Sequence, residues 1–219
     1  MHNDFMRDSV IKLILAKIDL QPQPALIRLD IGQLKCWSQK YPNVPPTESK
    51  LSLQLVAAAW ASHDVYGDDM PQIAANLLET GLDSPSLRRL ADETNVTCSA
   101  DVENLVAKMF REFDLPYPMP EKQAKLIVTR QVAREVIAGE RDPVRAGNYL
   151  ETVIWGWSSP TKDLSALFAL NDELVWDADH QRFATLITDD LIDTFGRLAL
   201  LTDTEISMEA EFKDAREER

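Results

Sequence analysis

Carboxylate side chains are concentrated between Asp172 and Asp193, a stretch in which Arg182 is the only Lys or Arg. Like charges at neighbouring helical positions destabilise a helix mildly unless a cation neutralises them. The stretch can therefore be the solvated face of an acidic protein, a surface for a basic protein partner, or a site for a divalent cation, which prefers oxygen ligands. It lacks the central glycine and terminal glutamate of an EF-hand loop, so we assign no metal ligand.

Tryptophan adds a second potential binding feature just before this stretch. Trp155 and Trp157 flank Gly156 at the end of an expected helix. Tryptophan is common both in protein cores and in binding hot spots, so these rings can serve either role. The residues that we expect to contact a basic partner are Asp177, Asp179, Asp189, Asp190, Asp193 and Trp157.

His63 and Asp64 form the one dipeptide with catalytic potential. Helical metal-dependent phosphohydrolases use such a pair within a larger set of histidines and aspartates. Those enzymes need further histidines at ligand spacing, and this chain has three histidines in all. The pair equally fits a helix end before a turn at Tyr66 and Gly67. A metal-dependent hydrolase that uses His63 and Asp64 remains an alternative hypothesis, and we predict no catalytic residue.

Composition argues against most other enzyme classes. Seven glycines and no GxxxxGK[ST] sequence leave nothing from which to build a common phosphate-binding loop. The chain has neither an HExxH motif nor a CxxC pair, which argues against a zinc site. We therefore expect no cofactor. The two cysteines, Cys36 and Cys98, suit a reducing compartment better than a disulfide framework.

The charge of the chain restricts its partners. The net charge is −13, with seven Lys or Arg against five Asp or Glu in residues 1–60, so residues 61–219 carry −15. Such a surface repels the phosphates of nucleic acids. No apolar run approaches the roughly 20 residues that a membrane-spanning helix needs, and the first residues do not resemble a signal peptide. We expect a cytoplasmic protein that binds neither nucleic acid nor membranes.

Helical periodicity with clear start and stop signals follows residue 60. From Ala100 to Phe113, apolar residues recur at intervals of three and four, with Ser99 as the expected N-cap. Pro120 opens a second such segment, which ends at Gly139. The pattern predicts an all-α fold, a multi-helix orthogonal or bundle-like domain of about eight to ten helices. Further helical patterns cover 73–80, 85–91, 143–157, 164–175 and 183–198.

Three segments are expected along the chain. Residues 1–46 form an N-terminal helical subdomain or extension, which ends in a proline-rich loop. The first 60 residues give mixed signals, because the alternation over 27–31 is strand-like, although we expect helices here too. Residues 47–202 form the main acidic helical domain. Residues 203–219 are polar, as a frayed helix or a loose tail would be.

Two blocks of sequence carry a resemblance to other proteins. They are LLETGLDSPSLRRLA, residues 77–91, and AREVIAGERDPVRAG, residues 133–147. Both resemble blocks in a set of uncharacterised bacterial helical proteins with no established activity, so the resemblance implies a helical fold and no catalytic residue. Small acidic bacterial proteins of this kind are similar in type to immunity proteins and antitoxins.

The sequence thus favours a non-enzymatic, acidic protein-binding module, of the type of a bacterial immunity protein or antitoxin that inhibits a basic partner. Two alternatives stay open beside it. One is the hydrolase described above, and the other is a structural subunit that self-associates through its amphipathic helices.

Overall fold

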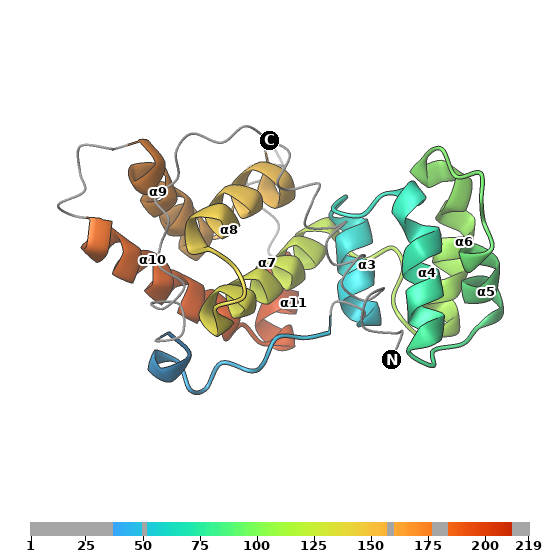
Figure 1. Ribbon diagram of the computed structural model, residues 1–219, viewed down its shortest axis with the longest axis horizontal. Coiled ribbons are helices and arrows are strands. Elements are labelled where there is room, and N and C mark those ends of the chain that lie inside the picture. The colour runs from blue at the N-terminus through green and yellow to red at the C-terminus, as the bar shows by residue number, and fades with distance from the viewer. Residues whose placement is uncertain (1–36, 50–51, 157–159, 177–183, 212–219) are drawn as a thin grey trace, which may run out of the picture. The chain divides into compact units, whose positions relative to one another are not determined.

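Every regular element in the part of the chain that the computed structural model describes is a helix, which confirms the all-α prediction. The described residues are 37–49, 52–156, 160–176 and 184–211. They belong to one of two compact units, residues 31–219, and the other unit, residues 1–30, lies outside the description. Within the described ranges the helices (Figure 1) are α3 Leu53–Ala61, η1 Gly67–Asp69, α4 Met70–Glu79, α5 Pro85–Ala91, α6 Ser99–Glu112, α7 Glu121–Ala138, α8 Pro143–Tyr149, η2 Leu150–Trp155, α9 Lys162–Trp176, α10 Ala184–Ala199 and α11 Asp203–Glu211.

Helices α4, α5 and α6 pack together through α5, which contacts both of the others. The Ser84 side chain caps α5 by accepting a hydrogen bond from the Leu87 N–H at 3.2 Å, and Pro85 follows it. Glu112, the last residue of α6, accepts hydrogen bonds from the N–H and the hydroxyl of Ser86. The end of α6 is therefore fixed to the start of α5.

The start of α6 differs by one residue from the sequence prediction. Cys98 is the N-cap, and its N–H donates to the Asp101 carboxylate at 3.0 Å. Ser99, the predicted cap, is the first helical residue, and its hydroxyl accepts a hydrogen bond from the Gly67 N–H at 3.1 Å. Ser99 therefore does not cap α6 but connects the start of this helix to η1.

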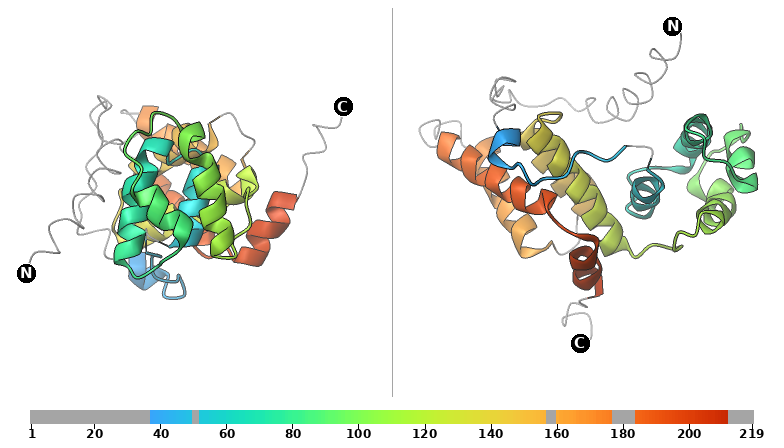
Figure 2. Two further views of the ribbon diagram at one scale, coloured as in Figure 1. Left: turned by 90° about the vertical axis from the view of Figure 1, so that its right-hand side faces the viewer. Right: turned by 90° about the horizontal axis from the view of Figure 1, so that it is seen from below.

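Helix α7 is covered on several sides, because α3, α10, α11 and η2 all contact it. Figure 2 shows α7 and α10 side by side in the view from below. The apolar residues of α7 from Ala124 to Ile137 are buried, as the helical period predicts, but so are most of the polar residues of this helix. Buried polar groups require hydrogen-bond partners, so the neighbours of α7 must supply them. These buried polar residues are Lys125, Thr129, Arg130, Gln131, Arg134 and Glu135.

Two buried arginines of α7 pair with carboxylates that lie before and after this helix in the sequence. Arg134 donates to the Glu48 carboxylate at 2.8 Å, and Arg130, one turn earlier, lies 3.5 Å from the same oxygen. Arg130 also pairs with Asp203 at 2.7 Å. Burial, followed by the charge of Arg130, lowers the pKa of Arg134. Glu48 therefore neutralises two buried cations at once.

Segments on both sides of the expected main domain pack against it. In the N-terminal segment Trp37 is buried, and the Ser38 hydroxyl donates to the carbonyl of Ile137 at the end of α7. Residues 203–211 form α11, which contacts α7 and buries Ile206. The expected boundaries at residues 46 and 203 therefore separate segments that are in contact in the folded chain.

Helices α8 and α9 meet at a glycine. A Cβ atom at Gly147 would lie 2.5 Å from the side-chain oxygen of Asn171, which is fully buried. The Asn171 amide nitrogen donates to the side chain of Asn148 at 2.7 Å. This contact fixes α9 against the end of α8. In η2, which follows α8 directly, Trp155 is buried and donates from Nε1 to the Thr129 hydroxyl at 3.0 Å.

Candidate partner-binding surface

Helices α9 and α10 are consecutive and in contact. Asp163, in the first turn of α9, pairs with Arg197 in the last turn of α10, with 3.2 Å between Oδ1 and Nε. The start of α9 therefore meets the end of α10, so the two helices form an antiparallel hairpin. Nine residues further along α9, Asp172 is therefore level with the early part of α10, where Asp189 and Asp190 lie.

Exposed carboxylates lie on both helices at that end of the hairpin. Asp172 and Glu173 on α9 are exposed, and so are Asp189 and Asp190 on α10. Glu151, on η2, is half-buried, and its pKa is raised first by burial and then by the charge of Asp172. We call these five residues the acidic end. Repulsion between the Glu151 and Asp172 carboxylates therefore adds to the larger effect of burial.

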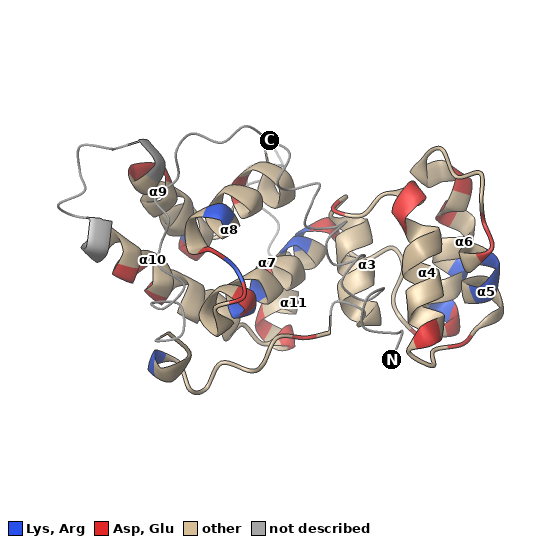
Figure 3. Ribbon diagram, viewed as in Figure 1, with Lys and Arg blue, Asp and Glu red and all other residues tan. Residues whose placement is uncertain are grey.

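Basic residues in the described parts of α9 and α10 lie at the opposite end of the hairpin. They are Lys162, at the start of α9, and Arg197, in the last turn of α10. Figure 3 shows acidic positions on both helices. The acidic end therefore has a carboxylate surplus that a cationic partner would relieve.

Asp193 was predicted as a partner contact, and it has partners within the chain. Lys40 pairs with it at 2.6 Å, and the Tyr41 hydroxyl donates to the same oxygen. The hydrogen bonds from Lys40 and then Tyr41 lower the pKa of Asp193. Burial and the bond to Asp193 raise the pKa of Tyr41 to about 12. Asp193 thus anchors the N-terminal segment to α10.

The other predicted contacts fall into two groups. Asp189 and Asp190 are exposed on α10 and belong to the acidic end. Trp157, Asp177 and Asp179 lie outside the described residues. Glu151 and Asp172 were not among the predicted contacts, because a pairing between different helices leaves no periodic signal in the sequence.

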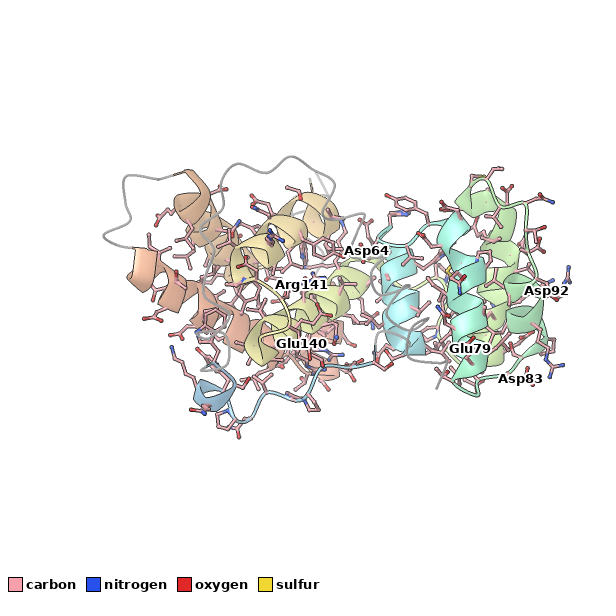
Figure 4. All side chains as sticks on the ribbon, viewed as in Figure 1. Asp64, Glu79, Asp83, Asp92, Glu140 and Arg141 are labelled. Carbon is pink, nitrogen blue, oxygen red and sulfur yellow. The ribbon has the colours of Figure 1, made fainter. Side chains whose placement is uncertain are left out.

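His63 and Asp64 lie just after the C-terminal end of α3. His63 takes a left-handed conformation, with φ of 61°, and the Asp64 N–H donates to the Ala59 carbonyl at 2.9 Å. Burial raises the pKa of Asp64, while a hydrogen bond from Tyr149 and the charge of Arg141 lower it. Asp64 and Arg141 are labelled in Figure 4. This geometry gives Asp64 a structural role between α3 and α8.

Arg141 connects this group to α7. Its guanidinium pairs with Glu135 at 3.0 Å and lies over the Tyr149 ring, 4.9 Å from the centroid. Among the residues that the structure describes, no group of three or more His, Cys, Asp or Glu side chains is placed to hold a metal ion.

Comparison of this chain with protein-family models, with curated proteins and with solved structures gives no match. None of the described helices is long and apolar enough to cross a membrane.

Proposed function

We propose that this chain is a non-enzymatic protein-binding module that acts in the cytoplasm and docks a basic protein partner at its acidic end. The observation that supports this function is the surplus of carboxylates there, which includes the opposed pair Glu151 and Asp172. Carboxylates that repel one another raise the energy of the unbound protein, and a cationic surface removes that repulsion on binding.

The partner that fits best carries a cluster of Lys or Arg side chains. Exposed carboxylates steer such a surface by long-range attraction and speed its association, an effect that salt screens. An immunity protein or antitoxin that covers the basic site of a toxin would use this chemistry, and we propose that class of inhibitor. The acidic end would cover the basic surface with which such a toxin binds its own target.

Two variants with equal loss of charge separate this function from a general effect of acidity. The test variant, D172N/E173Q/D189N/D190N, removes four exposed charges from the acidic end. The control, D68N/E79Q/D92N/D114N, removes four exposed charges from η1, α4 and the segments after α5 and α6. Both variants have the same net charge, so a difference between them depends on position.

Tagged wild-type protein and both variants are used for capture from the native lysate at low salt, and the retained protein is purified for calorimetry. We expect one basic protein to bind the wild type and the control alike, and to bind the test variant about tenfold more weakly or worse. The affinity should fall as salt rises. Equal binding to the two variants, or no stoichiometric protein on the wild type, would contradict the proposal.

A further inference from the structure

A second feature, away from the acidic end, has the chemistry to recognise a cation. A pocket of about 210 Å³ lies between α3, α6 and the connection from α6 to α7. Its volume suits a single long side chain. Its lining is mainly apolar and aromatic and contains no Lys or Arg: Ala57, Trp60, Ala61, His63, Glu103, Pro116, Tyr117, Pro118 and Met119.

The two aromatic walls are held in place before any ligand arrives. The Tyr117 ring stacks on Phe110, which is fully buried, with 5.9 Å between the ring centroids. Trp60 donates from Nε1 to the Tyr117 hydroxyl at 3.4 Å, which links the two walls. Both rings remain partly exposed to solvent. Rings held in this way lose little entropy when a ligand binds, so the pocket is preorganised.

The charge of the pocket selects among possible occupants. Glu103, from α6, is its one carboxylate and is exposed to solvent. Aromatic faces attract cations, and a guanidinium both stacks on such rings and binds a carboxylate with two parallel hydrogen bonds. The methylene stem of an arginine fits apolar walls such as Met119 and the flanking prolines.

We propose that this pocket receives one arginine side chain of the basic partner, with the guanidinium between Trp60, Tyr117 and the Glu103 carboxylate. This inference rests on the proposed function, because it identifies a residue type of that partner. It adds a specific recognition point to the diffuse attraction of the acidic end.

The first experiment uses defined small probes and the whole protein. N-acetyl-arginine amide is titrated against ¹⁵N-labelled protein, and the Trp60 indole N–H signal is followed by NMR, with W60F used for its assignment. N-acetyl-citrulline amide, which has nearly the same shape without the charge, is the matched control. We expect a saturable shift of the Trp60 signal with the arginine probe and roughly three- to fivefold weaker binding of the citrulline probe.

Substitutions locate the interaction. E103Q should weaken arginine binding roughly three- to fivefold, and W60L, which keeps an apolar wall, should weaken it similarly. Because variants at Trp60 lack the indole N–H, their binding is followed at the backbone N–H signals of Glu103 and Tyr117. Retained binding by W60F would show that the ring is what matters, and circular dichroism checks that each variant folds. Equal shifts with the arginine and citrulline probes, or no shift with either, would overturn the inference.

The two proposals fail in different ways. The variant D172N/E173Q/D189N/D190N should bind the arginine probe normally, because its substitutions lie on α9 and α10. If E103Q leaves binding of the captured partner unchanged while the acidic-end variant weakens it, the arginine pocket is wrong and the proposed function stands. If the pocket binds the probe but the acidic end binds no partner, the proposed function fails.

Discussion

The ring of Tyr41 lies directly on the backbone of Gly196, at the start of the last turn of α10. A Cβ atom at Gly196 would lie 2.5 Å from Cε1 and 2.7 Å from Cζ of that ring. The ring cannot easily move aside, because its hydroxyl donates to Asp193, which Lys40 also holds. The glycine therefore serves to let the N-terminal segment approach α10 closely.

This contact predicts that Gly196→Ala has opposite effects in two backgrounds. Alanine in a helix is favoured over glycine by up to about 1 kcal/mol, but overpacking against a fixed ring costs about 1–3 kcal/mol. We expect G196A to destabilise the wild type and to stabilise Y41A, as measured by urea unfolding. Stabilisation of the wild type by G196A would show that the ring is free to move.

Glu48→Gln should be among the more damaging single substitutions in the described part of the chain. It leaves Arg134, whose side chain is only 9% exposed, without the carboxylate that neutralises it, and it also removes a partner from Arg130. Breaking an ion pair around a buried cation costs about 2–4 kcal/mol. Urea unfolding at neutral pH would measure the loss. E140Q, which removes a charge from the loop after α7, is the control and should change stability little.

Glu151→Gln should make the protein more stable at neutral pH. The pKa of Glu151 is raised in the folded protein, so folding favours the protonated form of this side chain. The stability that this form contributes is fully present below the ordinary pKa of glutamate, and it is lost as the pH rises through the raised pKa. We expect a gain in the free energy of unfolding of about 0.3 kcal/mol at pH 7, and this gain should disappear near pH 4. Thermal unfolding of both proteins across this pH range would measure it. A gain that persists at pH 4 would exclude charge as the cause.

Thr129→Val tests a buried hydrogen bond between α7 and η2. Valine keeps the shape of threonine but cannot accept the hydrogen bond from Nε1 of Trp155, and both residues are buried. An unsatisfied buried donor costs about 1–3 kcal/mol. The free energy of unfolding should fall by this amount, whereas T152V, at an exposed position, should change it by less than about 0.5 kcal/mol. Similar losses in both variants would contradict the assignment.

Local chemistry explains how much of the fold could be predicted. Helix ends depend on residues within one turn, so the stop at Gly139 and the start at Ser84 and Pro85 are where the sequence places them. Periodicity also revealed the buried apolar stripe of α7. It could not reveal that the polar side of α7 is buried as well, because Arg130 and Arg134 are ordinary surface residues unless a distant carboxylate reaches them.

The same limit applies to the binding surface. Asp193 appears in the sequence as one more carboxylate in an acidic run, but its partner Lys40 lies 153 residues earlier in the chain. The opposition of Glu151 and Asp172 likewise depends on how η2 and α9 are placed. Sequence reasoning could identify the acidic stretch as a whole, and only the packing of helices separates the residues with internal partners from the exposed ones.

Helix α7 also bears on how the protein folds as it is synthesised. Glu48 precedes α7 in the chain, whereas Asp203 follows it, and Arg130 contacts both. When α7 has just emerged from the ribosome during synthesis, Glu48 is already outside, but Asp203 is not. The set of partners around Arg130 is therefore complete only once α11 has emerged from the ribosome and packed against α7.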